Sequence, residues 1–152
     1  MPIKNISHIA IEVHQMDTSV AFWTDVVGLH VSLDAHEEFT LDGTLTRRRG
    51  VYLREHEGAD EPFIVLDEGL STPYAGEPKP LFQIGVHHFG FWVDDIDAIA
   101  ARARAAGTPI VVEPSEQGVD TTAYGEPSGG RVRSMFVRDP DGNTIQFDQR
   151  VP

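Results

Sequence analysis

The chain has 152 residues, enough for one domain or for two closely joined half-domains. Its 24 acidic residues outnumber the 12 basic residues and give a formal net charge of −12, so we expect no binding to nucleic acid or to an anionic membrane surface. The absence of cysteine excludes a disulfide framework and a thiol nucleophile. No apolar run reaches the length of a membrane span, and the first residues lack the layout of a signal peptide, which favours a cytoplasmic location.

The sequence repeats itself at an offset of 80 residues. His8–Val13 aligns with His88–Val93, and Met16–Val20 aligns with Ile96–Ala100. In each copy a short strand pattern leads directly into a helical pattern, and further strand patterns follow. Because a repeat of this length defines the architecture, the sequence predicts an α+β fold of two βαβββ modules forming a curved mixed sheet around a central cavity.

We expect a single domain over 1–152, with module one at 1–68, a linker at 69–85 and module two at 86–152. The linker contains three prolines and a glycine between residues 73 and 80, a composition that does not suit a helix or a central strand. A second irregular stretch, 115–130, contains four glycines and reads either as a lid or as a mobile segment.

The two predicted helices occupy equivalent places in the modules. The first is expected to begin near Asp17, whose carboxylate can cap free backbone N–H groups, and to end at Gly28. The second has Asp94, Asp95 or Asp97 as candidate caps and ends at Gly107. Residues at helical spacing predict the buried faces: Val20, Trp23 and Val27 in the first helix, and Ile96, Ile99, Ala103 and Ala106 in the second.

Strand patterns follow each helix. In the first module they cover about 29–34, 48–55 and 62–67, and in the second about 110–113, 131–138 and 144–148. The segment 139–143, Asp-Pro-Asp-Gly-Asn, predicts a tight turn between the last two strands. We expect the segments 37–46 and 115–130 to act as loops that shape the ligand pocket.

The repeat pairs certain polar residues across the modules. His8 and His88 each open a first strand, while Val65 and Gln146 each lie in the middle of a last strand. If these four side chains point inward they meet near the pseudo-two-fold axis, where they would form a cradle for a metal ion or a polar ligand group. A single histidine at such a position is more often a surface or core residue, but a symmetry-related pair favours a site.

Four stretches, in order along the chain, resemble the vicinal oxygen chelate superfamily, which includes glyoxalase I, methylmalonyl-CoA epimerase, extradiol dioxygenases, fosfomycin-resistance enzymes and bleomycin-resistance proteins. These stretches are His8–Val13, Ala21–Leu29, His87–Ile96 and Phe136–Asn143. The resemblance implies a small-molecule ligand and a homodimer. Since this fold supports several chemistries and simple ligand binding, the resemblance alone does not select a reaction.

In metal-using members of that superfamily, the ligands are a histidine opening each module and a carboxylate or glutamine in each final strand. Carried to this sequence, they become His8, Val65, His88 and Gln146, so the implied metal ligands are His8, His88 and Gln146. Valine cannot bind a metal and glutamine is neutral, so the resemblance implies only a weakly held divalent ion: iron, manganese, nickel or zinc. Neither residue can replace the final-strand glutamate that serves such enzymes as a base.

Three functional hypotheses remain open. The first is a small-molecule enzyme of the glyoxalase or dioxygenase type, in which the weakly held metal polarises substrate oxygens. The second is a metal-free protein of the bleomycin-resistance type that sequesters an aromatic or cationic compound, with Phe91, Phe136 and Asp148 as candidate ligand-binding residues. The third is a catalyst without metal that uses His8 or His88 as general base. The sequence favours the first hypothesis.

Overall fold

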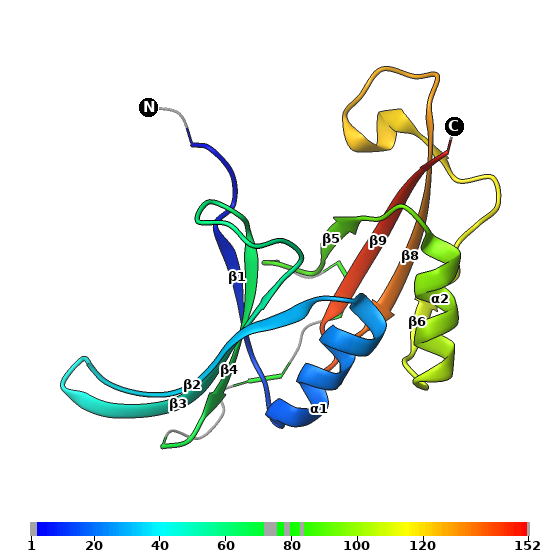
Figure 1. The fold of residues 1–152 in the computed structure, drawn as a ribbon. Helices are drawn as coiled ribbons and strands as arrows, with labels where there is room; N and C mark the ends of the chain where they lie inside the picture. Colours follow the sequence, from blue (N-terminus) through cyan, green and yellow to red (C-terminus); the bar gives the residue numbers. More distant parts are fainter. Residues whose placement is uncertain (1–2, 72–75, 78–79, 83, 152) are drawn as a thin grey trace. The chain divides into compact units, whose positions relative to one another are not determined.

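The computed structural model describes residues 3–71, 76–77, 80–82 and 84–151. The chain divides into two compact units, 1–77 and 78–152, and each is described by itself. Each unit contains a mixed sheet and one main helical segment, which confirms the predicted α+β class and the two βαβββ modules (Figure 1). Part of the predicted linker, at 72–75, 78–79 and 83, lies outside the described residues.

The first unit contains a four-stranded sheet in the order β1-β4-β3-β2. Its strands are β1 (His8–Glu12), β2 (His30–Leu41), β3 (Thr44–Arg54) and β4 (Phe63–Gly69). β1 runs parallel to β4, and the other neighbours are antiparallel. Arg49 on β3 binds Asp17 on the helical segment, so alternation directs Val51 and Leu53 toward the helix and Arg48 and Tyr52 to the opposite face.

The helical segment of the first unit consists of α1 (Met16–Ala21) and a π-helical continuation, η1 (Phe22–Val27). Gly28 ends it with φ 97°, as predicted. The prediction that Asp17 caps this helix is wrong: the N-cap is Gln15, which makes no side-chain capping bond, and the Met16 N–H donates to Glu68 on β4 instead. The wider π turn places Phe22, Trp23 and Val26 in the core.

The segment 37–46, expected to be a loop, belongs to the long hairpin of β2 and β3. Asp42 (φ 48°) and Gly43 (φ 78°) form its turn, with Leu41 paired to Thr44. β3 pairs with β4 only from Arg48 onward, so the end of the hairpin extends beyond the rest of its sheet (Figure 1). Its tip carries exposed apolar side chains, including Phe39, Leu41 and Leu45.

The second unit contains a five-stranded sheet ordered β5-β9-β8-β6, with β7 paired to β8. The strands are β5 (Phe89–Trp92), β6 (Ile110–Val112), β7 (Val119–Asp120), β8 (Arg131–Arg138) and β9 (Thr144–Val151), and a 3-10 turn, η2 (Thr121–Tyr124), lies in the glycine-rich stretch. As in the first unit, the first strand is parallel to the last, because β5 pairs with β9. The tight turn at 139–143 joins β8 to β9, and Asp139 accepts bonds from the Asp141 and Asn143 N–H groups.

Helix α2 (Ile96–Ala105) packs on one face of this sheet. Asp95 is its N-cap, because its side chain accepts a hydrogen bond of 2.9 Å from the Ala98 N–H. Ile96, Ile99 and Ala103 are buried as predicted, whereas Ala106 is exposed because the helix ends one residue earlier. Within the described residues, no helix is long and apolar enough to cross a membrane.

Candidate ligand-binding site in the second unit

The second unit has a cavity of about 740 Å³. It lies on the sheet face opposite α2. Arg133 on β8 pairs with Asp97 on α2, so alternation turns the neighbouring Ser134 and Phe136 away from the helix. Ser134 and Phe136 line the cavity, together with residues of β5 and β9 and residues of the 115–130 stretch. The pleat of the sheet therefore separates an apolar core on the helix side from a mixed polar and aromatic wall.

Asp148 on β9 is the centre of a polar cluster in this wall. Its Oδ1 accepts hydrogen bonds of 2.7 Å from the Tyr124 hydroxyl and 2.7 Å from the Gln146 amide nitrogen. That amide nitrogen also donates to the Tyr124 oxygen at 3.2 Å, and the Ser134 hydroxyl lies 2.6 Å from the same oxygen. Asp148 is only 7% exposed, and its two hydrogen bonds fix the orientation of its carboxylate.

His88 lines the same cavity immediately before β5. Its Nδ1 lies 2.8 Å from Nδ1 of His87, and its ring meets Phe136 edge-on at 5.5 Å. Burial, followed by the neighbouring His87, lowers the pKa of His88, while Asp148 acts weakly in the other direction. The imidazole is therefore neutral at pH 7, the form that accepts a proton or binds a metal ion.

Aromatic side chains supply part of the remaining wall. Trp92 is 52% exposed, lies 5.5 Å from Tyr124 between ring centroids and has Arg150 over its ring at 4.5 Å. Phe91 also borders the cavity, although its ring stacks on the buried ring of Phe147 on the core side. The cavity thus offers flat apolar surfaces next to a carboxylate and a phenol, an arrangement typical of small-molecule sites.

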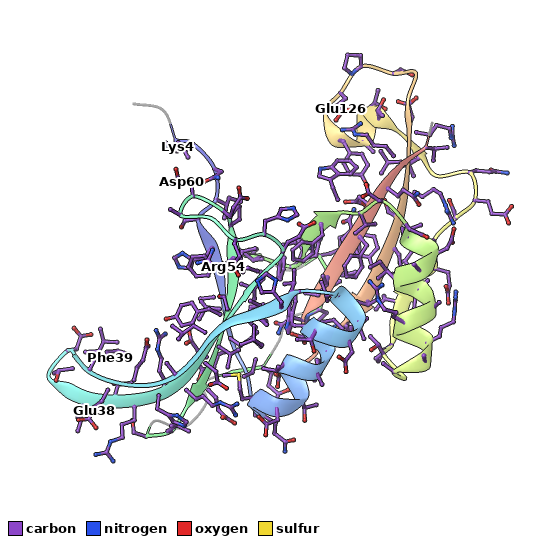
Figure 2. All side chains as sticks on the ribbon, viewed as in Figure 1. Lys4, Glu38, Phe39, Arg54, Asp60 and Glu126 are labelled. Atoms are coloured by element: carbon purple, nitrogen blue, oxygen red, sulfur yellow. The ribbon has the colours of Figure 1, made fainter. Side chains whose placement is uncertain are left out.

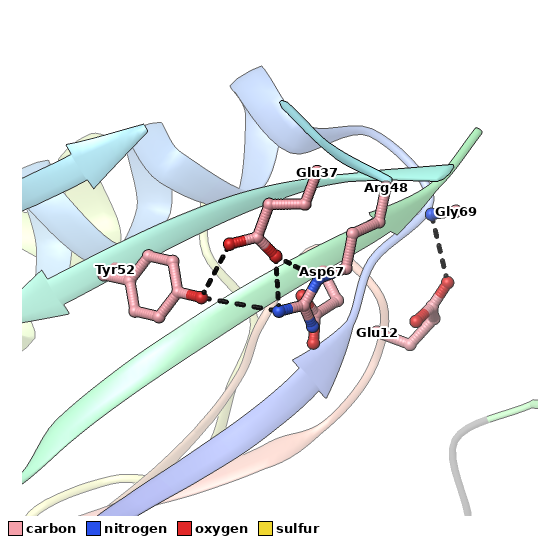
Figure 3. Close-up of polar contacts among 6 residues, drawn as sticks. All are labelled: Glu12, Glu37, Arg48, Tyr52, Asp67 and Gly69. Atoms are coloured by element: carbon pink, nitrogen blue, oxygen red, sulfur yellow. Dashed lines mark hydrogen bonds and ion pairs between the residues drawn. The ribbon is translucent and has the colours of Figure 1, made fainter. Parts of the chain in front are cut away.

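The corresponding face of the first unit carries charged side chains that are already paired (Figure 3). Arg48 binds Glu37 at 2.6 Å and Asp67 at 2.7 Å, and the Tyr52 hydroxyl donates to Glu37 at 3.3 Å. We call Glu37, Arg48, Tyr52 and Asp67 the Arg48 cluster. Burial raises the pKa of the Asp67 carboxyl, and the Arg48 charge opposes that rise. The guanidinium is saturated by its own neighbours, so this face resembles a structural network more than an open site.

Glu12 lies beside the Arg48 cluster and accepts a 3.2 Å bond from the Gly69 N–H (Figure 3). Burial raises the pKa of its carboxyl, and nearby Asp67 adds to the rise.

Near the other end of β1, Lys4 pairs with Asp60 at 3.2 Å, and Arg54 lies over the Phe63 ring at 4.5 Å (Figure 2).

The residues predicted from the sequence fall in both units. His88, Gln146, Phe91, Phe136 and Asp148 all border the cavity of the second unit. His8 belongs to the first unit, where its ring stacks on Phe63 at 5.0 Å. Tyr124, which binds Asp148, was missed. It lies in a stretch marked only by its glycines, and no sequence pattern connects its hydroxyl with β9.

A metal ion implied by the resemblance can be tested against the side chains present. Among the described residues, no three histidine, cysteine, aspartate or glutamate side chains gather as a cation-binding group. Val65 is buried and has no donor atom, and the Gln146 amide nitrogen is engaged by Asp148 and Tyr124. Two imidazoles and one amide carry no negative charge, so these ligands suit a weakly held ion and not a tightly bound one.

Comparisons with known proteins agree with this architecture. A family model described as Glyoxalase/Bleomycin resistance protein/Dioxygenase superfamily matches residues 5–147. A lactoylglutathione lyase of Haemophilus influenzae is 28% identical over 93% of this chain and 90% of its own length. A probable chloroplastic lactoylglutathione lyase of Arabidopsis thaliana is 25% identical over 98% of this chain, which spans 37% of that longer protein. A glyoxalase family protein from Bacillus cereus superposes with a TM-score of 0.79 at 18% identity, covering 100% of this chain and 97% of that one.

Proposed function

Because the chain belongs to the Glyoxalase/Bleomycin resistance protein/Dioxygenase superfamily, we propose that it is an enzyme acting on a small organic molecule held in the cavity of the second unit. The observation that supports this proposal is the set of reactive groups in one cavity wall. A neutral imidazole, a phenol, a carboxylate and an amide lie around the same space. A cleft that only binds an apolar ligand does not require these four reactive groups.

Each of these groups has a role that follows from its contacts. His88 can accept a proton from a bound molecule, because its imidazole is neutral and lines the cavity. Asp148 and Gln146 hold the Tyr124 hydroxyl in one orientation, which leaves the phenol ring fixed against the ligand space. Phe136 and Trp92 provide the flat surfaces that exclude water from an aromatic or aliphatic substrate.

A divalent ion remains a prediction from the resemblance. His88 and Gln146, together with His8, would hold iron, manganese, nickel or zinc weakly, and the bound ion would polarise substrate oxygens. The test is elemental analysis after reconstitution with each of the four metals. We expect substoichiometric metal that dialysis removes. Tight, stoichiometric metal would show that the charge argument is wrong.

The lactoylglutathione lyase reaction named for some relatives is not expected here. Val65 and Gln146 stand where the resemblance implies a base, and neither can take up the proton. We therefore expect no measurable isomerisation of the methylglyoxal–glutathione hemithioacetal, assayed by ultraviolet absorbance with each of the four metals. Efficient turnover would contradict this part of the proposal.

The enzyme proposal is tested by a search for turnover. Purified protein and the His88→Ala variant are incubated with a small-metabolite extract and each metal, and mass spectrometry follows the loss of compounds and the appearance of products. We expect at least one compound to be converted by the wild type and not by the variant. A His56→Ala variant, altered at an exposed histidine of the first unit, is the control and should retain the conversion.

A second candidate function is a metal-free binding protein that sequesters its ligand. The observation that favours it is the combination of aromatic cavity walls with the absence of a carboxylate at positions 65 and 146. It predicts compounds that co-purify with the protein unchanged and no turnover in the extract experiment. Conversion that depends on His88 would exclude it.

We also propose that the chain forms a homodimer, as the resemblance implies. Sedimentation velocity at micromolar concentration would then give a mass near twice the 16.8 kDa of the single chain. A species that stays at the mass of one chain over the whole concentration range would contradict the proposal.

A further inference from the structure

Asp148 and Asp67 occupy equivalent positions in the two units. Each lies on the last strand and is paired in register with the first strand, Asp67 with Glu12 and Asp148 with Trp92. In the first unit Arg48 neutralises Asp67 through an ion pair of 2.7 Å. In the second unit the described partners of Asp148 are the neutral Tyr124 hydroxyl and the neutral Gln146 amide. Only one of the two carboxylates is therefore compensated by a cation within its own unit.

No described residue donates a hydrogen bond to the second carboxylate oxygen of Asp148, Oδ2. Both hydrogen bonds to this side chain end on Oδ1. Oδ2 points toward Gly90, and a Cβ placed on Gly90 would lie only 3.3 Å from it. Only a residue without a side chain leaves room for the Asp148 carboxylate at this point, and both residues line the cavity. A hydrogen-bond donor bound in the cavity therefore lies next to this carboxylate.

The cavity supplies no positive charge of its own. Its described lining residues include the carboxylates of Asp148 and Glu113 but no lysine or arginine, and of these two carboxylates Glu113 is paired with Arg104 outside the cavity lining. Arg150, which lies over the Trp92 ring, is already held by Glu126 through bonds of 2.6 and 2.9 Å. A buried carboxylate without a cation is costly, and a ligand that carries positive charge removes that cost.

The walls around the carboxylate are aromatic. Trp92 and Tyr124 lie on one side, and Phe136 lies on the strand next to β9. Aromatic faces attract cations and also stack on other rings, whereas they offer nothing to a free carboxylate.

We propose that the cavity of the second unit selects small molecules in which a protonated amine lies next to aromatic groups, with the amine bound by Asp148. This inference rests on the proposed function, because it names the ligand class of the same cavity. It separates this chain from relatives named for a glutathione conjugate, since the carboxylates of such a molecule would be repelled by Asp148.

The test uses three probes that share one hydrocarbon body: 3,3-diphenylpropylamine, 3,3-diphenylpropan-1-ol and 3,3-diphenylpropanoate. Binding is followed by tryptophan fluorescence, since Trp92 lines the cavity and the other tryptophan, Trp23, is fully buried in the first unit. Calorimetry checks each affinity independently. Because a hydrogen bond to a charged group contributes about 1.5–3 kcal/mol, we expect the amine to bind about ten- to a hundredfold more tightly than the alcohol, and the carboxylate to bind most weakly.

The Asp148→Asn variant should bring the amine and the alcohol within about threefold of each other while leaving the affinity for the alcohol nearly unchanged. The control is Asp42→Asn, which removes the same charge at the β2–β3 turn of the first unit and should keep the wild-type preference. The comparison of the three probes on the wild type stands even if a variant does not fold.

Each outcome decides a different question. Equal affinities for the three probes, or tightest binding of the carboxylate, would overturn the charge preference but keep the cavity as the ligand site. An amine preference that survives Asp148→Asn would overturn the role of Asp148. If no probe binds, the inference fails; the proposed enzyme then still depends on the separate search for turnover lost in His88→Ala.

Discussion

At the scale of single residues, the surroundings of a side chain decide what it can do. Asp67 and Asp148 have equivalent positions in the two modules. Asp67 forms an ion pair with Arg48, whereas Asp148 faces a cavity. Val65 and Gln146 show the same divergence, because one is an apolar core residue and the other a hydrogen-bond donor to a carboxylate. The two modules therefore share one scaffold, while the side chains on their equivalent sheet faces differ.

The burial of His88 makes a prediction about pH. Its pKa in the folded chain is lower than in the unfolded chain. As the pH falls below about 6.5, the unfolded chain takes up a proton at this position before the folded chain does, so acidification favours unfolding. We expect the difference in free energy of unfolding between the wild type and His88→Ala to become smaller between pH 7.5 and pH 5.5. Urea denaturation across this range measures it.

The matched control for this measurement is His56→Ala, since His56 is exposed and lies outside the cavity. Its difference from the wild type should change much less with pH. A difference for His88→Ala that stays constant, or that grows on acidification, would show that His88 is not held in its neutral form.

The site could be predicted from the sequence only in part. The paired positions of His8 and His88 followed from the repeat, and alternation along β9 linked Gln146 with Asp148. Tyr124 could not be found in this way, because its role depends on how a glycine-rich stretch of irregular backbone folds back onto β8 and β9. Tyr124 and Asp148 are 24 residues apart, so their hydrogen bond corresponds to no periodic pattern in the sequence.

At the scale of elements, the β2–β3 hairpin carries two neighbouring arginines with different surroundings. The Arg48 side chain is 27% exposed and binds Glu37 and Asp67, of which the latter is 14% exposed. Arg47, on the opposite face of the strand, is 60% exposed and pairs with Glu38. Glu38 is labelled on the hairpin in Figure 2. Partly buried carboxylates left without a cation destabilise a fold, whereas exposed ion pairs contribute little.

We therefore expect Arg48→Met to lower the free energy of unfolding by about 1–2 kcal/mol and Arg47→Met to lower it by less than about 0.5 kcal/mol. Urea denaturation of the two variants gives the comparison directly. Equal losses would mean that the Arg48 cluster does not stabilise the first unit.

The N-terminus of α2 offers a second test at this scale. Asp95 caps the Ala98 N–H, so Asp95→Ala should cost about 1 kcal/mol. Asp94 contributes its backbone carbonyl, which accepts from Gln149, and Asp94→Ala keeps that carbonyl. A thermal unfolding midpoint that falls for Asp95→Ala but hardly changes for Asp94→Ala is the expected result. A larger fall for Asp94→Ala than for Asp95→Ala would contradict the assignment of Asp95 as the N-cap of α2.

Some of the secondary-structure elements were predicted correctly and others were not. β8 was expected at 131–138 and lies there, because the turn at 139–143 defines where the strand ends. The hairpin end at 37–46 was taken for a loop, although Asp42-Gly43 is the dipeptide that suits a tight hairpin turn with two positive φ angles. The cap of α1 was misplaced because Arg49 binds Asp17 and Glu68 binds the Met16 N–H, two contacts that only the tertiary fold creates.

At the scale of the whole molecule, the repeat was the strongest signal. An offset of 80 residues placed both first strands and both helices, and an offset of 81 placed both final strands, before any single residue was interpreted. The acidic balance of the chain also fits the proposed ligand class, because a net charge of −12 draws cationic small molecules toward the protein. Ligand chemistry, by contrast, depends on which side chains line one cavity, and the repeat says nothing about that.

The central claim is that a small molecule binds in the cavity of the second unit. Backbone amide chemical shifts, recorded by NMR during a titration with 3,3-diphenylpropylamine, test it most directly. If the ligand binds there, saturable shifts will be concentrated at Gly90, Trp92, Ser134 and Gln146, all of which line the cavity. Saturable shifts concentrated instead around Tyr52 and Asp67 in the first unit would show that the ligand binds outside this cavity.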